Sequence, residues 1–206
     1  ECPDCGTKLS RSDHEVVWRC TNNSCPARTW RHIQHFASKG ALDIEGMGEK
    51  NVMALLESNL IEDAADIYAL KKEQLLTLDR FADLSAHNLI EAIDQKRKPQ
   101  LSKFIFALGI RHVGAQTAVD LAKHFRSFQK FLESDAIELA EINGIGQVVA
   151  ESITAWITDP ENLKLIEKFK TNQVNVLDLE AVKTGNLRGK SFAITGALES
   201  MSREAA

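Results

Sequence analysis

Four cysteines near the start of the chain have the residue type and spacing of a metal site. Cys2 and Cys5 form one close pair, and Cys20 and Cys25 form a second. Two such pairs separated by a loop can supply four thiolates to a tetrahedral ion. Because that shell has no open position, we expect a structural zinc ion and no catalytic role for it. Two disulfides or free buried thiols are the alternatives, and a cytoplasmic setting disfavours the disulfides.

The residues around the cysteines predict a small finger. A strand is expected over residues 15–19, between the two pairs, and Trp18 and Trp30 are expected to pack around the metal. His14 could compete as a ligand, but with four cysteines present we expect it to be an exposed loop residue.

Closely spaced glycines indicate a second kind of chemistry. The runs Gly46-Met47-Gly48 and Gly144-Ile145-Gly146 each lie between two apolar helical patterns. Glycine allows a tight turn and close approach of the backbone to a ligand. The helix that follows begins with N–H groups that bind anions. This helix–hairpin–helix pattern predicts a grip on one backbone phosphate of a nucleic acid, without reading its bases.

The glycine pattern recurs at a regular period. Gly48, Ala82, Gly114 and Gly146 occupy equivalent positions, at steps of 34, 32 and 32 residues. Such a period is typical of a repeat. We therefore predict four copies arranged as two pairs, with short helices over residues 62–70 and 128–133 joining the members of each pair. The alternatives are ordinary helix C-caps and a helical solenoid.

The four copies are not equally complete. The second reads Arg80-Phe81-Ala82 and lacks both glycines, so we expect it to be mainly structural. The third reads His112-Val113-Gly114 and keeps one glycine. A small or branched apolar residue follows four positions after each turn, and these residues are Val52, Ala86, Ala118 and Ala150.

Apolar spacing predicts the helices that hold the turns. Helices are expected over residues 30–37, 52–56 and 101–108, and a last one begins at Asp159-Pro160, where aspartate is the N-cap and proline the first helical residue. In the first of these helices, His32 and His35 are expected to face solvent or to cap. Residues 172–186 are expected to be a linker.

Composition limits the partners. The chain has 206 residues and a net charge of −4, which is unusual for a DNA-binding protein. Backbone N–H groups carry no formal charge, however, so we expect weak DNA binding by the chain alone and support from a larger protein. The run Lys96-Arg97-Lys98 is expected to be a solvated helix end. No segment resembles a membrane span or a signal peptide, which favours the cytoplasm.

The ordered set of motifs resembles the C-terminal half of bacterial NAD-dependent DNA ligase. The last motif, in residues 187–196, resembles the opening of a BRCT domain, and the chain is expected to be a fragment because it starts at Glu1 and stops within an incomplete helix. The stretches that carry the resemblance are Cys2-Pro3-x-Cys5-Gly6, Cys25-Pro26-Ala27, Asp43-Ile44-Glu45-Gly46-Met47-Gly48, Ala107-Leu108-Gly109-Ile110-Arg111-x-Val113-Gly114, and Thr195-Gly196-x-Leu198 with Ser202-Arg203.

The resemblance implies a mainly α architecture with four parts. These are a four-cysteine zinc finger over residues 1–28, a helix–hairpin–helix domain over 29–171, the linker over 172–186, and a truncated α/β BRCT start over 187–206.

The resemblance also implies a function, which is sealing nicks in duplex DNA during replication and repair. An N-terminal domain of the family takes AMP from NAD onto a lysine with Mg or Mn, an OB domain follows, and the finger and hairpins complete a clamp around the DNA. The adenylated Lys-x-Asp-Gly motif does not occur in this sequence, so no catalytic residue is assigned and the chain alone is expected to be inactive. The implied protein is a monomer in the bacterial cytoplasm, at the nucleoid.

The family's site residues carry over by motif. The zinc ligands are Cys2, Cys5, Cys20 and Cys25. The DNA-binding positions are Gly46, Met47, Gly48, Gly114, Gly144, Ile145 and Gly146, with Lys50 and Arg111 as charged helpers.

Three other functions fit parts of the sequence. A junction-binding or excision-repair subunit would also use paired hairpins, but it explains neither the finger nor the BRCT-like tail. A helix–hairpin–helix glycosylase would use Lys50 with Asp63 or Asp66, but it needs a base pocket for which no spare domain exists. An acidic chain could also be a scaffold that does not contact DNA.

Overall fold

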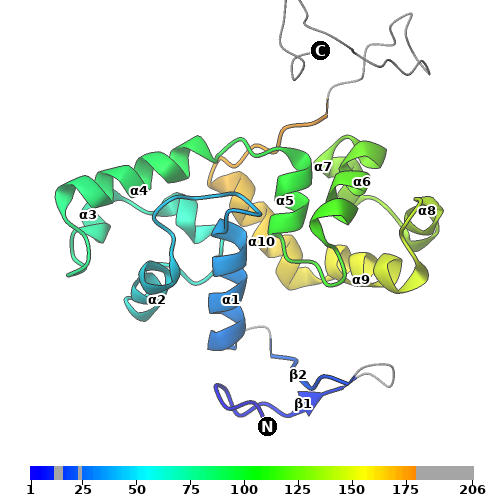
Figure 1. The fold of residues 1–206 in the computed structure, drawn as a ribbon, viewed down its shortest axis with the longest axis horizontal. Coiled ribbons are helices and arrows are strands. Elements are labelled where there is room, and N and C mark those ends of the chain that lie inside the picture. Colours follow the sequence, from blue (N-terminus) through cyan, green and yellow to red (C-terminus); the bar gives the residue numbers. More distant parts are fainter. Residues whose placement is uncertain (12–15, 23–24, 180–206) are drawn as a thin grey trace, which may run out of the picture.

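Helices make up most of the chain in the computed structural model, which describes residues 1–11, 16–22 and 25–179. The mainly α fold expected from the sequence is thereby confirmed (Figure 1). The helices are α1 (Pro26–Ala37), α2 (Glu49–Glu57), the 3-10 helix η1 (Asp66–Ala69), α3 (Lys72–Leu75), α4 (Asp83–Gln95), α5 (Leu101–Ala107), α6 (Ala115–Phe125), α7 (Phe128–Leu132), α8 (Ala136–Glu141), α9 (Gln147–Thr158) and α10 (Pro160–Thr171).

Two short strands form the finger below the helical body in Figure 1. Strand β1 (Leu9–Ser10) pairs antiparallel with β2 (Arg19–Cys20), with Leu9 opposite Cys20. The strand predicted over residues 15–19 is therefore wrong in position. Val16 is 89% exposed and Trp18 57% exposed. An alternating pattern forms a strand only where it can pair with a neighbouring strand and pack against a core, and Val16 and Trp18 do neither.

The hydrophobic core joins segments that are far apart in the chain. The Phe36 and Phe169 rings stack at a centroid distance of 5.2 Å, and Phe104 meets Phe169 edge-on at 5.3 Å. These three side chains come from α1, α10 and α5.

Helix α1 begins at Pro26, four residues before the start expected from the sequence, because proline fits the first turn of a helix.

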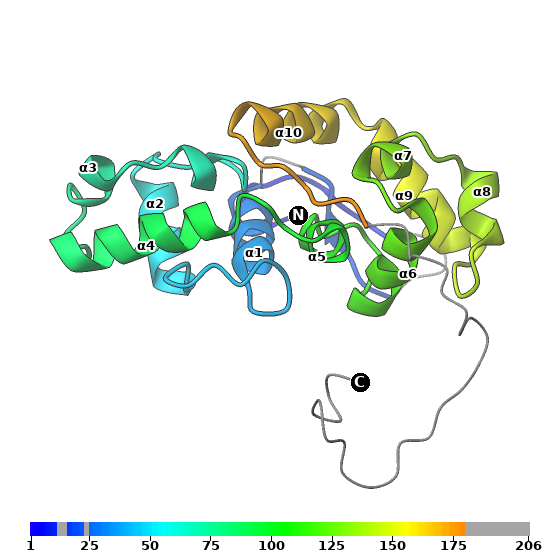
Figure 2. The same cartoon turned by 90° about the horizontal axis from the view of Figure 1, so that it is seen from above.

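The helices form four successive helix–turn–helix units. We call them hairpins one to four, with turns at residues 44–48, 78–82, 110–114 and 142–146. Helices α1–α2, α3–α4, α5–α6 and α8–α9 flank these turns, and η1 and α7 lie between the members of each pair. In Figure 2, the turns of hairpins one, three and four lie toward the lower side of the molecule, while α10 lies on the upper side.

The segment after α10 runs back over the helical body. Val174 is buried, Asn175 N donates to Arg97 O at 2.8 Å, and Leu177 N donates to Pro99 O at 2.9 Å. The predicted linker thus begins with residues that are hydrogen-bonded to the domain. The BRCT-like stretch over 187–206 lies outside the described residues. Within the described ranges, no helix has the length and apolar character needed to cross a membrane.

Candidate metal centre and nucleic-acid interface

The backbone of the finger brings the two cysteine pairs together. Cys2 N donates to Thr7 O and Gly6 N donates to Cys2 O, which closes a tight turn that contains Cys5. Gly6 has a φ of +70°, which a side chain would strain. The β1–β2 pairing places Cys20 beside this turn, and Cys25 follows as the N-cap of α1.

The four sulfur atoms have the arrangement of a tetrahedral site. All lie within 4.8 Å of one another. Cys2 Sγ and Cys25 Sγ are 3.8 Å apart, and Cys5 Sγ and Cys20 Sγ are 3.5 Å apart. A disulfide requires about 2 Å, whereas four thiolates on zinc, each about 2.3 Å from the metal, lie about 3.8 Å apart. The residues present therefore fit a zinc ion that holds two knuckles together.

The thiols sit in unlike surroundings. The Thr7 hydroxyl, hydrogen-bonded to Cys5 Sγ at 3.3 Å, helps to lower the pKa of Cys5 to about 6. Burial raises the pKa of Cys20 instead. Cys5 therefore loses its proton more easily than Cys20 does. A bound cation would stabilise the thiolate form of Cys20. His14 lies outside the described residues.

The four turns share one backbone pattern. In each turn, the N–H of the buried central residue donates to the carbonyl three positions earlier, and the N-cap carbonyl accepts from the residue four positions later. The first set of donors is Met47, Phe81, Val113 and Ile145, and the second is Val52, Ala86, Ala118 and Ala150. All eight are buried. The structure therefore has the four-copy repeat predicted from the spacing.

All four helices that follow these turns begin without a side-chain hydrogen bond from the N-cap residue, and three of them have glycine at that position. Gly48, Gly114 and Gly146 are the N-caps of α2, α6 and α9, with extended φ of −70°, −82° and −82°. By contrast, the Asp135 carboxylate accepts from Ile137 N and Glu138 N at the start of α8. The first N–H groups of α2, α6 and α9 are therefore left to an outside acceptor.

Space is open in front of these glycines. A Cβ added at Gly48, Gly114, Gly144 or Gly146 would meet nothing within 4 Å. Gly46 and Gly144 have φ of +88° and +86°, which favours glycine, and His112 takes φ +63° at the same point of hairpin three. The missing glycine of hairpin three is thus replaced by a residue that tolerates the same backbone conformation.

Hairpin two differs from the other three. None of its described residues has a positive φ. At the start of α4, Ala82 N donates to Ser85 Oγ at 2.9 Å, and Asp83 forms an ion pair with Lys72 at 2.8 Å. The Lys72 ammonium holds the pKa of Asp83 below its usual range, so this carboxylate stays charged. A negative charge and a satisfied N–H both oppose phosphate binding.

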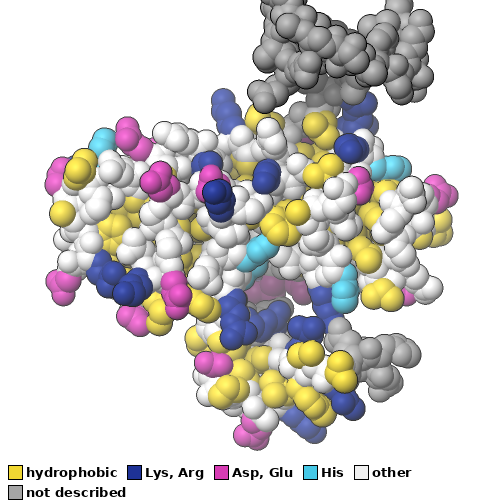
Figure 3. All heavy atoms as spheres, in the orientation of Figure 1, with side chains coloured by type: hydrophobic (Ala, Val, Ile, Leu, Met, Phe, Trp, Pro, Cys, Tyr) yellow, Lys and Arg dark blue, Asp and Glu magenta, His cyan; other side chains and the backbone are white. Residues whose placement is uncertain are grey.

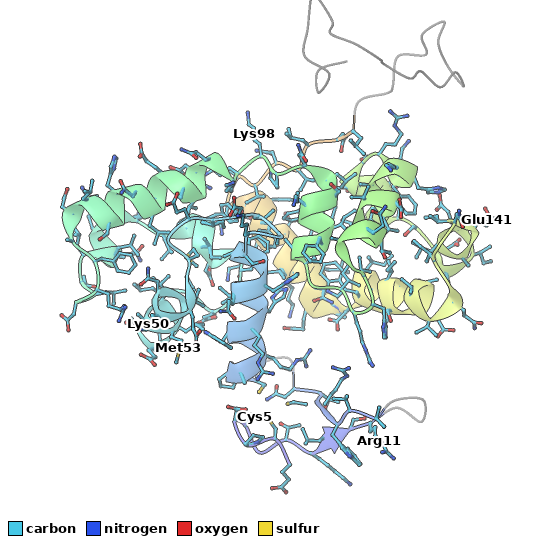
Figure 4. The ribbon with its side chains drawn as sticks, in the orientation of Figure 1. Cys5, Arg11, Lys50, Met53, Lys98 and Glu141 are labelled. Atoms are coloured by element: carbon cyan, nitrogen blue, oxygen red, sulfur yellow. The ribbon has the colours of Figure 1, made fainter. Side chains whose placement is uncertain are left out.

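The remaining predicted contact residues fall into two groups. Lys50 is exposed in the first turn of α2, and Arg111 is exposed in the turn of hairpin three. Met47 and Ile145 are buried, so only their backbones can face a ligand. Figure 4 shows Lys50 and Glu141, the last residue of α8, near opposite ends of the molecule. Hairpins one and four therefore lie in separate parts of the helical body.

Two histidines have a role that the sequence did not reveal. Nε2 of His32 is 3.0 Å from Leu108 O, and Nε2 of His35 is 2.8 Å from Phe106 O. A carbonyl only accepts, so both rings carry their proton on Nε2. The expectation that these side chains face solvent is wrong, whereas the capping alternative is met, because they bond the last carbonyls of α5. They fix α1 to the end of α5, directly before hairpin three.

The acidic residues that a glycosylase would need are used structurally. Lys168 Nζ of α10 is 2.7 Å from a carboxylate oxygen of both Asp63 and Asp66. Burial alone would lower the pKa of Lys168, but these two carboxylates raise it, so the amine stays charged. Both carboxylates also accept backbone N–H groups near η1. They tie α10 to the first half of the body and are not free to act as bases.

Comparison with known proteins finds three family models along the chain. Residues 1–27 match the NAD-dependent DNA ligase C4 zinc finger domain, residues 39–95 a SAM-like helix-hairpin-helix tandem, and residues 103–166 a helix-hairpin-helix motif. A DNA ligase of Syntrophus aciditrophicus (strain SB) is 43% identical over 205 residues, which is 100% of this chain and 30% of the relative. A DNA ligase of Carboxydothermus hydrogenoformans is also 43% identical and is covered to 31%. The chain thus spans about a third of the length of these curated relatives.

Proposed function

We propose that this chain belongs to the NAD-dependent DNA ligase family and is the part of a ligase that holds nicked duplex DNA through its backbone. The relatives that match the whole chain are DNA ligases, and the matched models are a C4 zinc finger and helix-hairpin-helix units. The observation that carries the proposal is the set of three helices with uncapped glycine N-termini facing open space.

Each of hairpins one, three and four would bind one phosphate. The N–H groups at the start of a helix combine direct hydrogen bonds with the favourable end of the helix dipole. The contact positions are Gly46, Met47 and Gly48 with Lys50 in hairpin one, Arg111 and Gly114 in hairpin three, and Gly144, Ile145 and Gly146 in hairpin four. Hairpin two would support hairpin one, because Arg80 Nε donates to Asn51 Oδ1 at 3.5 Å and Asn51 Nδ2 donates to Gly46 O at 2.8 Å.

The proposed division of the chain follows these roles. Residues 1–28 form the finger with its structural zinc, residues 29–171 form the DNA-binding domain, and residues 172–186 lead to a BRCT domain that begins at 187. Zinc would hold the finger together without taking part in chemistry, because four cysteines fill its shell.

The chemistry of nick sealing would lie in other domains of the parent protein. Those domains would take AMP from NAD with Mg or Mn, and this chain would complete a clamp with the adenylation and OB domains. A monomeric enzyme of replication and repair, working in the cytoplasm at the nucleoid, fits this division.

The test is a binding titration with nicked, intact and single-stranded DNA of arbitrary sequence at several salt concentrations. The double variant Gly48→Leu/Gly146→Leu adds bulk where the backbone is extended and the space is open. We expect its affinity for nicked duplex to fall about tenfold for each hairpin, because a hydrogen bond to a charged group contributes about 1.5–3 kcal/mol. The unchanged chain should prefer the nicked duplex and lose affinity as salt rises.

A matched control is Ala82→Leu, which adds similar bulk at the equivalent N-cap of hairpin two. This variant should bind DNA like the unchanged chain. If the double variant keeps its zinc, its thermal stability and its full DNA affinity, the assignment of the hairpins as phosphate sites is wrong. Equal affinity of the unchanged chain for nicked and intact duplex would favour a general binding module over the ligase role.

A further inference from the structure

Four lysines line one hollow between the two hairpin pairs. Lys39 comes from the loop after α1, Lys96 and Lys98 from the loop after α4, and Lys103 from α5, around a volume of about 310 Å³. The only carboxylate in the lining is that of Asp43. The hollow is therefore positively charged, although the whole chain has a net charge of −4.

Three of these ammonium groups have no partner in the described part of the protein. Lys103 Nζ donates to Gly40 O at 3.0 Å, but Lys39, Lys96 and Lys98 make no side-chain hydrogen bond or ion pair with a described residue. Like charges that gather without counter-charges attract an anion. These three ammonium groups would form ion pairs with an anionic ligand in the hollow.

The loop that carries two of the lysines is held rigidly. The expectation of a solvated helix end fails at Arg97, whose guanidinium donates to Asn172 O at 2.6 Å, Tyr68 O at 2.8 Å and Asp94 Oδ1 at 2.7 Å. Arg97 thus anchors the loop, while Lys96 and Lys98 on either side line the hollow. A preformed site loses less entropy on binding than a mobile one.

The position of the hollow points to the same ligand that the hairpins would bind. The loop that contains Lys39 and Asp43 runs directly into the turn of hairpin one, and α5 runs directly into that of hairpin three. That loop lies on the lower side of Figure 2, as do these turns. Figure 3 views this side of the molecule face-on, and separate Lys and Arg side chains lie on its upper part, where α4 ends and α5 begins, with Asp and Glu side chains among them. A duplex held by both hairpins would pass this surface.

We propose that the lysine hollow binds a backbone phosphate of the same duplex, between the phosphates held by hairpins one and three. This inference rests on the proposed function. The site would add charge where the hairpins offer only backbone N–H groups, and it would bind every sequence equally. Its contribution should appear mainly as salt dependence, because a lysine that neutralises a phosphate releases counterions.

The experiment compares the Lys96→Gln/Lys98→Gln variant with the unchanged chain in the duplex-binding titration. The slope of log affinity against log salt should become shallower by about 0.9, the value for one phosphate contact. A control with the same change of charge is Lys130→Gln/Lys164→Gln, on α7 and α10, which lie toward the upper side of Figure 2, opposite the turns of hairpins one and three. Its slope should not change.

The outcomes separate this inference from the proposed function. If the hairpin double variant loses affinity but the Lys96/Lys98 variant keeps the full slope, the hollow is not a phosphate site and the hairpin proposal stands. If the unchanged chain binds no duplex at any salt concentration, both proposals are wrong. A third outcome is that both proteins have the same salt slope for DNA, while the original chain binds polyglutamate and the Lys96→Gln/Lys98→Gln variant does not. The hollow then binds an acidic protein segment, and this inference is overturned.

Discussion

At the scale of single residues, the glycines of one turn have different tasks, and stability measurements can separate them. Gly144 has φ +86°, whereas Gly146 has φ −82°. Gly144→Ala should lower the free energy of unfolding by about 1–2 kcal/mol through left-handed strain. Gly146→Ala should change it little, because an alanine fits both the backbone and the open space. Denaturant unfolding of both variants measures the difference, and equal losses would contradict it.

The first hairpin adds a packing cost that the sequence did not indicate. A Cβ at Gly46 would lie 3.2 Å from Leu89 Cδ1 of α4, whereas one at Gly144 meets nothing within 4 Å. Gly46→Ala should therefore destabilise the protein more than Gly144→Ala does. The spacing of glycines predicted both turns, but contacts between α4 and hairpin one depend on how the helices pack. A pattern in one segment does not contain that information.

At the scale of elements, α1 is joined to hairpin three through His32, and this joint predicts a pH effect. Burial lowers the pKa of His32 below its ordinary value of 6.5, and the bond to Leu108 O offsets only part of this. The unfolded chain therefore binds the proton more readily than the folded one. The contribution of neutral His32 to the free energy of unfolding is fully present above about pH 6.5. It is lost as the pH falls through the lower pKa that His32 has in the folded protein.

The measurement is urea unfolding between about pH 7.5 and about pH 5.5 with zinc in excess. His32→Gln keeps an N–H that can reach Leu108 O but cannot be protonated, so the loss of stability at low pH should be smaller. His124→Gln changes an exposed histidine of α6 that lies 3.4 Å from Glu138 and serves as the comparison at the surface. The same pH dependence in all three proteins would show that His32 is not the titrating group.

The helices and their turns could be predicted because the signals are local. Asp159 caps α10 with its carboxylate 2.8 Å from Glu161 N, as the Asp-Pro pair predicted. The strand over 15–19 and the solvent-facing histidines were wrong for a shared reason. Both depend on whether another segment lies beside them, and the partner of His32 is 76 positions away in the chain. Local periodicity cannot supply such a partner.

At the scale of the whole molecule, polar contacts among the described residues join two halves with similar hairpin pairs. Helix α10 connects back through Lys168 to Asp63 and Asp66, the loop at Arg97 receives the segment after α10, and α1 meets α5 through its histidines. The joints are polar and lie around the shared aromatic core. We expect the two halves to unfold in one transition, because each of these contacts joins one half to the other and is lost when either half unfolds.

The finger should behave differently from the halves when zinc is removed. Its described residues contribute only Cys2 and Cys25 to the buried apolar set, so its structure would depend on the metal. Cys25 is also the N-cap of α1, and its carbonyl accepts from Arg28 N and Thr29 N. A chelator should therefore unfold the finger and fray the first turn of α1. Ile33 and Phe36, which are fully buried, should keep the rest of α1 in place.

Circular dichroism, a zinc assay and duplex binding in the same samples check this expectation. The helical signal should fall only slightly, and DNA affinity should decrease less than in the Gly48→Leu/Gly146→Leu variant, because the glycine N-caps of α2, α6 and α9 belong to the hairpins and not to the finger. Cys20→Ser should reproduce the effect of the chelator, since three thiolates leave the zinc shell open. If chelation instead unfolds the whole chain in one transition, the zinc holds the hairpin domain together as well, and the finger is part of the same cooperative unit.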